Sequence, residues 1–427
     1  MNILLKNIHI VSPEQKLDKY SDILIIDGII EKIGFNIATT IKPIQIINAK
    51  DYTCTPGFYD MHVHFREPGP THKETILTGA AAAMNGGFTG VLCMPNTDPP
   101  LDSPYIIETF IRRYSNLLAD IDFTGCVTKK RAGKELSAFM SLSDAGVKGF
   151  TDDGSPVEDP LLMRYALEYC VQLDKVFIQH AETTALSNKG AMNEGKVSTS
   201  MGLRAIPTIS ESVMVARDIL ITKFIKGARY HLQHISCADS VELIRNAKKN
   251  GLNVTTEVCP HHFILTEEAC FGFNTNAKMN PPLRSEHDRQ ALIEGLRDGT
   301  INVLCTDHAP HTDYEKSMGF YEAPFGIIGL ETCVGLSYKY LVETNVISFK
   351  RFVEYLAVNP RKILKIETPK IKEGEAANLT ILNVNKEWKI NKGKFKSKSR
   401  NTPFNGFKAK CKPVAVINKN QIYFSDL

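Results

Sequence analysis

The regular alternation of strand-like and helix-like segments beyond residue 55 limits the possible folds of this 427-residue chain more than any other feature. Apolar runs suited to buried strands alternate there with amphipathic stretches, and such alternation indicates a parallel sheet covered by helices. We count eight strand-like runs, at residues 56–65, 88–95, 120–127, 145–151, 175–181, 229–235, 253–259 and 301–307. Eight strands close a barrel, so we predict an α/β fold built on a TIM-like (β/α)8 barrel.

Helix-capping signals between these runs agree with the alternation. A helix expected over 73–85 stops at Gly86-Gly87, and one expected over 103–118 opens with Asp102-Ser103-Pro104. A third, over 285–298, opens at Ser285 and stops at Gly299. These residue types are typical of helix starts and ends.

Both ends of the chain have a β texture instead. Residues 1–55 include an Asp27-Gly28 turn between two apolar runs, and strand-like sequence returns at 377–382 and 414–423. Because the edges of two separate β units would be exposed, we expect the two ends to pair into one small β-sandwich. The predicted domains are therefore 1–55 and 366–427 for the β-sandwich and 56–365 for the barrel.

Composition argues against several classes of partner. The chain has 51 basic and 47 acidic residues, and a net charge of +4 is too small to indicate a nucleic-acid partner. No segment is apolar for long enough to cross a membrane, and the N-terminal residues do not resemble a signal peptide. The ten cysteines contain no Cys-x-x-Cys pair. We expect reduced thiols and a cytoplasmic location.

Polar residues gather where the predicted strands end. Because the carboxyl ends of all strands of a (β/α)8 barrel meet at one mouth, these residues are expected to form one site. In chain order they are His62, His64 and Arg66; Asn96; Asp152 and Asp153; His180; His234; His261 and His262; and Asp307, His308 and His311.

The histidines and carboxylates of this set suit zinc. His62 and His64 are two residues apart on one strand and leave it on the same face. With the donors at other strand ends, there are enough nitrogen and oxygen ligands for two ions. Asp153 can bridge two metals, as could Lys148 if carbamylated, although a solvated lysine is the commoner role. Two such metals turn a shared water into hydroxide and polarise an amide carbonyl.

Two further residues predict the rest of the chemistry. Asp307, at the eighth strand, is placed to carry a proton beside the bridging water. Arg66 offers a two-pronged donor for a carboxylate, which predicts an anionic substrate.

Seven motifs together resemble the amidohydrolase superfamily and, within it, dihydroorotases of the class I bacterial type, over essentially the whole chain. They are Asp60-Met61-His62-Val63-His64-Phe65-Arg66-Glu67-Pro68-Gly69, Met94-Pro95-Asn96-Thr97, Thr151-Asp152-Asp153-Gly154, Lys278-Met279-Asn280-Pro281-Pro282-Leu283-Arg284, Thr306-Asp307-His308-Ala309-Pro310-His311, Pro324-Phe325-Gly326-Ile327-Ile328-Gly329-Leu330-Glu331 and Ser399-Arg400-Asn401-Thr402-Pro403-Phe404.

The resemblance implies roles for twelve residues. Two Zn²⁺ per subunit would be bound, one by His62, His64 and Asp307 and the other by His180 and His234, with Asp153 bridging both. The substrate's α-carboxylate would be held by Arg66 and Asn96, and the rest of the substrate by Asn280, His311, Phe325 and Gly326.

The resemblance also implies the reaction. It is the reversible cyclisation of N-carbamoyl-L-aspartate to L-dihydroorotate in de novo pyrimidine biosynthesis, with a bridging hydroxide and with Asp307 as general acid and base. A homodimer that can associate with aspartate transcarbamoylase is the implied assembly.

Several alternatives stay open at the level of sequence. The adjacent Asp152 leaves the bridge uncertain by one residue. Hydantoinases, dihydropyrimidinases and allantoinases bridge their metals with a carboxylated lysine at about the place of Lys148. A third alternative is an inactive dihydroorotase-like scaffold of aspartate transcarbamoylase, although such proteins lack metal ligands that this chain has. His231, three residues before His234, is expected to pack rather than bind metal.

Overall fold

The centre of the molecule is a ring of eight parallel strands. The computed structural model describes residues 1–40 and 42–427. The barrel strands are β6 (Phe58–Val63), β7 (Phe88–Cys93), β8 (Asp120–Phe123), β9 (Gly149–Phe150), β10 (Val176–Gln179), β13 (Tyr230–Leu232), β14 (Val254–Val258) and β15 (Val303–Leu304). They pair in two stretches, β6-β7-β8 and β9-β10-β13-β14-β15. Bridges between Gly125 and Phe150 and between Val63 and His308 join the stretches into a closed ring. The predicted barrel is confirmed.

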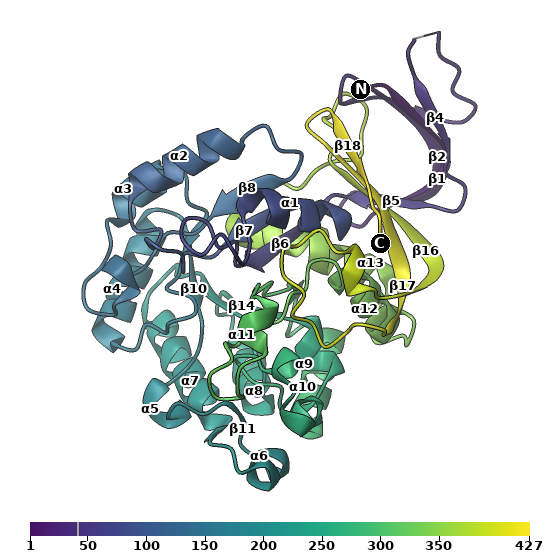
Figure 1. Ribbon diagram of the computed structural model, residues 1–427. Coiled ribbons are helices and arrows are strands. Elements are labelled where there is room, and N and C mark those ends of the chain that lie inside the picture. The colour runs from purple at the N-terminus through teal and green to yellow at the C-terminus, as the bar shows by residue number, and fades with distance from the viewer. Residues whose placement is uncertain (41) are drawn as a thin grey trace.

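Helices follow the strands and form the outer layer (Figure 1). The helices after the first seven strands are α1 (Ile76–Asn85), α2 (Pro104–Tyr114), α3 (Phe139–Asp144), α4 (Pro160–Gln172), α7 (Ile209–Phe224), α8 (Ala238–Lys249) and α10 (Glu286–Asp298). After β15 come α12 (Cys333–Ser337), α13 (Phe349–Val353) and α14 (Asn359–Leu364).

The three expected helices are present with shorter bounds. α1 begins at Ile76 rather than residue 73, because Thr75 and Thr78 form a reciprocal capping box there. The Ser285 side chain accepts a hydrogen bond from the amide of Asp288 and starts α10, while Gly299 ends it in the left-handed conformation.

Burial explains why the barrel strands read as apolar runs. All six residues of β6 and all six of β7 are buried, as expected for strands packed on both faces. Phe58 of β6 lies 6.4 Å from Phe88 and 6.1 Å from Phe352, measured between ring centroids. These contacts belong to the largest core cluster of the protein.

Both ends of the chain share one mixed sheet of eight strands beside the barrel (Figure 1). Its strands are β1 (Ile3–Ser12), β2 (Leu17–Ile26), β3 (Ile29–Gly34), β4 (Gln45–Asn48), β5 (Thr53–Pro56), β16 (Leu379–Lys389), β17 (Lys408–Asn418) and β18 (Gln421–Phe424). The two ends join where β5 pairs antiparallel with β16, with Cys54 opposite Ile381. β5 ends two residues before β6 begins, so the sheet is tied directly to the first barrel strand.

Several short helices and strands lie in the loops that follow the carboxyl ends of the barrel strands. They are α5 (Thr184–Ser187), β11 (Met192–Asn193), α6 (Lys196–Met201) and β12 (Ala205–Ile206) before α7, α9 (Pro260–Ile264) after β14, and α11 (Asp313–Lys316) after β15. Within the described ranges, no helix combines the length and apolar character needed to cross a bilayer.

Candidate metal centre

A cavity of about 370 Å³ opens at the carboxyl ends of the barrel strands. Eleven of the twelve residues expected at the site line it: His64, Arg66, Asn96, Asp153, His180, His234, Asn280, Asp307, His311, Phe325 and Gly326. The twelfth, His62, is fully buried, but its ring contacts Asp153 and Asp307. Residues from seven strand ends and their loops therefore meet at one place.

The Asp153 carboxylate lies between two pairs of histidines. Its Oδ2 is 3.5 Å from His62 Nε2 and 3.3 Å from His64 Nε2. Its Oδ1 is 3.6 Å from both His180 Nδ1 and His234 Nε2. Each oxygen thus faces its own pair, which is the arrangement that a carboxylate bridging two cations needs.

The neighbouring Asp152 points elsewhere. Its carboxylate accepts hydrogen bonds from the amides of Val127 and Thr128 and from the Thr128 hydroxyl. Lys148 also lies away from this cavity. It precedes β9, at the amino end of the barrel, where its amine is 3.5 Å from Asp122 and lines a different cavity with Tyr59.

Three of the four histidines have a hydrogen-bond partner on the outer side of the ring. His62 Nδ1 is 2.6 Å from Glu257 Oε1, His64 Nδ1 is 2.8 Å from Asn96 Oδ1, and His180 Nε2 is 3.1 Å from Glu182 Oε2. When the outer nitrogen donates to its partner, the inner nitrogen keeps its lone pair for a metal. Such outer acceptors are the usual partners of metal-ligating histidines.

The buried charges of this site call for cations. Burial by itself would lower the pKa of His62, but Asp307, Asp153 and Glu257 surround its ring and raise that pKa well above its ordinary value. Burial also opposes ionisation of Asp153, yet His62, His180 and His234 hold the pKa of this carboxyl well below its usual range. Anionic carboxylates this deeply buried require positive charge beside them.

The donor set of this site is suited to holding metal ions. Among the described residues, five groups of donor atoms lie close enough to hold an ion, and three of them consist only of residues expected to bind metal: His62, His64 and Asp153; His62, His234 and Asp307; and Asp153, His180 and His234. Asp153 Oδ1 is buried without a hydrogen-bond partner, as expected of an oxygen directed at a cation. Imidazole nitrogen with carboxylate oxygen is a common zinc ligand set.

Asp307 stands at the edge of this group. Its Oδ1 is 2.8 Å from His64 Nε2 and 3.5 Å from His62 Nε2. Burial opposes its ionisation, but His62 and His64 lower its pKa below the usual range. Its φ of +45° is uncommon for a residue other than glycine, and such backbone conformations concentrate at functional sites.

Two basic side chains, Arg66 and Lys73, contact His311 in the wall of the cavity, and Lys73 is also paired with Glu315 at 2.6 Å. Arg66 is anchored by donation from Nε to the carbonyl of Pro310, at 3.3 Å, and its Nη2 is 3.4 Å from His311 Nε2. Lys73 Nζ lies 3.4 Å from His311 Nδ1. Burial, Arg66 and Lys73 lower the pKa of His311 to about 2, so its ring is neutral. An anion entering the cavity would meet Arg66 as its nearest buried cation.

The segment around Phe325 and Gly326 is tied to the protein. The Gly326 amide donates to the carbonyl of Lys278, and its carbonyl accepts from Lys316 Nζ and Asn401 Nδ2. A Cβ at Gly326 would lie 2.8 Å from the Ala309 carbonyl oxygen and from His311. Because its amide and carbonyl are already hydrogen-bonded within the protein, the Gly326 backbone has little capacity left to bind substrate. The absence of a side chain at Gly326 lets this segment pass close to His311.

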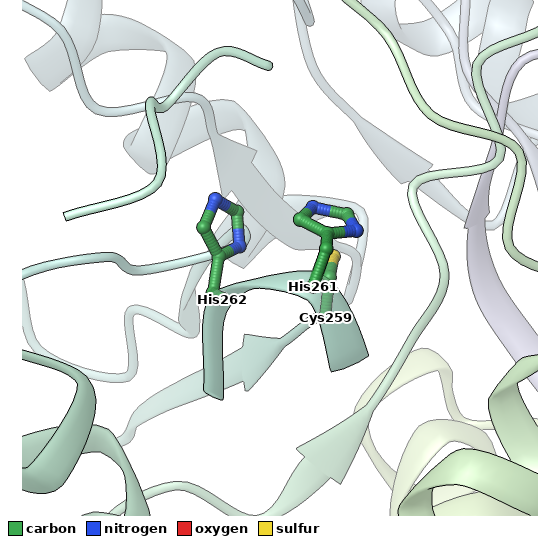
Figure 2. A group of neighbouring side chains, drawn as sticks. All are labelled: Cys259, His261 and His262. Atoms are coloured by element: carbon green, nitrogen blue, oxygen red, sulfur yellow. The ribbon is translucent and has the colours of Figure 1, made fainter. Parts of the chain in front are cut away.

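Cys259, His261 and His262 form a separate buried group at the end of β14 (Figure 2). Figure 2 shows the two rings next to each other, with the Cys259 sulfur beside His261; the ring centroids are 4.3 Å apart. His262 Nε2 donates to the Pro281 carbonyl at 2.9 Å, so this ring supports the segment that carries Asn280.

Sequence reasoning missed two carboxylates that contact the histidines of the site. Glu182 follows His180 by two residues, a spacing that could have suggested a shared face, and it also accepts from Asn280 Nδ2 at 2.8 Å. Glu257 has no local signal in the sequence. Its Oε1 contacts His62, and its Oε2 lies 3.3 Å from His231 Nε2, so the buried His231 ring packs behind this carboxylate.

Comparisons with known proteins give a consistent result. A family model described as "Dihydro-orotase-like" matches residues 53–240. The chain is 44% identical over 430 residues to a dihydroorotase of Carboxydothermus hydrogenoformans, covering 100% of this chain and 99% of the relative. It is 46% identical over 409 residues to a dihydroorotase of Elusimicrobium minutum, covering 95% and 94%. Among solved structures, L-hydantoinase (dihydropyrimidinase) from Arthrobacter aurescens shares the fold, with a TM-score of 0.87 at 24% identity over 99% of this chain and 96% of that one.

Proposed function

The chain belongs to the dihydroorotase family, and we propose that the residues lining the cavity carry out the reaction of that family. This reaction is the reversible cyclisation of N-carbamoyl-L-aspartate to L-dihydroorotate in pyrimidine biosynthesis. The observation that carries the proposal is that one cavity holds both a two-cation donor set and a buried arginine for a substrate carboxylate.

Two zinc ions would be held by the donors described above. His62, His64 and Asp307 would bind one, His180 and His234 the other, and Asp153 would bridge them. When bound, the ions would acidify a water molecule and polarise the amide carbonyl under attack.

Asp307 would move the proton. In the hydrolytic direction it takes a proton from the attacking water and gives it to the ring nitrogen that leaves, and in ring closure it does the reverse. The burial of its carboxylate keeps bulk water from competing for this proton.

The substrate would be oriented by side chains already held in place. Arg66 would bind the α-carboxylate with the nitrogens that Pro310 does not occupy. Because Asn96 Oδ1 accepts from His64, the Asn96 amide would turn its NH₂ group to the same carboxylate. Asn280 is fixed by Glu182 and, with the neutral His311 and the Phe325-Gly326 segment, would contact the rest of the ring.

The assembly and location that we propose follow the sequence expectations. All ten cysteines are free and buried, which supports a reducing compartment such as the cytoplasm. A homodimer is the expected state, and association with aspartate transcarbamoylase is a further hypothesis. Small-molecule substrates suit the dimensions of the cavity.

One assay separates the candidate activities. The purified protein, with zinc and after treatment with a chelator, is given dihydroorotate, hydantoin and allantoin in parallel. We expect zinc-dependent hydrolysis of dihydroorotate at a kcat/KM at least ~100-fold above that for the other two, since only dihydroorotate carries the carboxylate that Arg66 would bind. No turnover of dihydroorotate by the zinc-loaded protein would refute the proposal, and preference for hydantoin would favour the hydantoinase alternative.

A further inference from the structure

The buried group of Cys259, His261 and His262 takes no part in the reaction proposed above. All three residues are at most 2% exposed, and they lie outside the lining of the cavity. β14 ends at Val258, and Pro260 begins α9 directly afterwards, because a proline fits the first turn of a helix. This abrupt change from strand to helix brings a sulfur and two imidazoles together.

Two ring nitrogens of the group are buried and have no hydrogen-bond partner among the described residues. They are His261 Nε2 and His262 Nδ1. Figure 2 shows a nitrogen of His262 turned toward the His261 ring, and the two ring centroids are 4.3 Å apart. Folded proteins rarely leave a buried polar atom unpaired, since that atom has lost its water without gaining another partner. Two such atoms on neighbouring rings therefore indicate a ligand that both of them bind.

The hydrogen bond of His262 prepares its ring to bind a cation. Nε2 donates to the Pro281 carbonyl at 2.9 Å, so the neutral ring has its lone pair on Nδ1, facing His261. Burial lowers the pKa of His262 to about 4, and burial together with His262 lowers the pKa of His261 well below its ordinary value. Both rings are therefore neutral near pH 7. A histidine fixed by a carbonyl through its outer nitrogen is typical of a metal ligand.

We propose that Cys259, His261 and His262 bind a third metal ion, a thiophilic cation of the zinc type, apart from the two ions of the cavity. One donor atom of each residue lies within 4.8 Å of the other two, so one ion with bonds of ~2.0–2.3 Å reaches all three after small side-chain movements. On binding, the Cys259 thiol releases its proton to solvent, and the thiolate sulfur forms the bond to the metal. This site does not depend on the reaction proposed for the cavity.

The donor atoms select the ion and indicate its role. The cavity offers imidazole nitrogen and carboxylate oxygen, whereas this group adds a thiolate, which favours Zn²⁺ over Mg²⁺ or Ca²⁺. Complete burial is typical of a structural ion, because no substrate reaches it. The ion would tie the end of β14 to α9, and the hydrogen bond from His262 to Pro281 would extend this tie to the segment that carries Asn280.

Cobalt(II) in place of zinc tests the proposal, because a thiolate bound to cobalt gives a charge-transfer band in the near ultraviolet that nitrogen and oxygen ligands do not give. Since the donors are buried, cobalt is supplied during expression. We expect the wild type to show this band and to hold three cobalt ions per chain by mass spectrometry. Cys259→Ser should lose the band and one ion. Cys305→Ser is the matched control and should keep both, since the Cys305 sulfur lies only 3.4 Å from that of Cys259 but outside the donor group.

Three results would overturn the proposal: a wild type without the band, a Cys259→Ser variant that keeps it, or a folded Cys305→Ser variant that loses it. The band reports on this site whatever the occupancy of the cavity, and circular dichroism shows whether each variant is folded. A second measurement needs no variant. X-ray absorption at the zinc edge of the wild type as purified should show a sulfur neighbour at ~2.3 Å. Nitrogen and oxygen neighbours alone would equally count against the site.

Discussion

Replacing Asn96 by aspartate separates two roles that the structure gives to one side chain. Asn96 Oδ1 accepts a hydrogen bond from His64 Nδ1, at 2.8 Å, which leaves the NH₂ group for the substrate carboxylate. Asn96→Asp keeps an acceptor for His64 but turns a carboxylate toward the carboxylate of the substrate. Asn96→Ala removes both functions.

The size of the effect follows from the groups involved. A hydrogen bond to a charged group is worth ~1.5–3 kcal/mol, and repulsion between two carboxylates near a protein surface adds on the order of 1–4 kcal/mol. Asn96→Asp should therefore cost at least about 3 kcal/mol of the free energy with which the substrate carboxylate is bound. This cost corresponds to a fall of roughly a hundredfold in kcat/KM. Most of it should appear as a raised KM.

The assay combines dihydroorotate hydrolysis with zinc analysis by mass spectrometry. Asn96→Asp should keep the zinc content of the wild type, whereas Asn96→Ala should bind zinc ~10–100-fold more weakly, because His64 loses its orienting partner. Asn405→Asp is the control, since Asn405 Oδ1 only accepts from the Lys392 amide at the surface. The reasoning fails if Asn96→Asp retains a kcat/KM within about threefold of the wild type.

Three further predictions concern single residues. Asp307→Asn should lower kcat by ~10²–10⁴-fold while zinc content falls only partly, because the histidine ligands remain; an active variant would show that another group carries the proton. Lys148→Ala should leave both zinc content and kcat within about twofold of the wild type, since Lys148 pairs with Asp122 away from the cavity. Loss of both zinc and activity would instead support Lys148 as the group that bridges the metals. Burial raises the pKa of Glu331 from 4.5 to about 7 although Asn85 and two backbone amides donate to it, so the folded state loses stability as pH rises from about 4.5 through 7. In urea unfolding, this loss should reach up to about 3 kcal/mol in the wild type relative to Glu331→Gln, and parallel pH profiles of the two proteins would contradict it.

The sequence was sufficient for the barrel because burial on both faces makes its strands continuous apolar runs. All eight runs contain a strand, and most of the polar residues at their ends line the cavity, whereas His62, Asp152, His261, His262 and His308 do not. The pairing of the two chain ends could be predicted too, since neither β unit alone could cover its edges. The π-helical turn at Glu354–Val358, which continues α13, has no such signal.

The features of the site that the sequence could not predict depend on contacts between residues far apart in the chain. Asp152 and Asp153 are indistinguishable in the sequence, and the amides of Val127 and Thr128 decide which one turns away. The pairing of Glu257 with His62 joins positions 195 residues apart. Neither follows from local periodicity, because both depend on where barrel closure brings other strands.

The most direct test of the account is the position of bound zinc in crystals grown with zinc and dihydroorotate. Anomalous scattering at the zinc edge is predicted to give two peaks on either side of the Asp153 carboxylate. One should lie beside His62, His64 and Asp307 and the other beside His180 and His234, with the substrate carboxylate on Arg66. A single peak, a peak at Lys148, or substrate bound away from Arg66 would contradict the account.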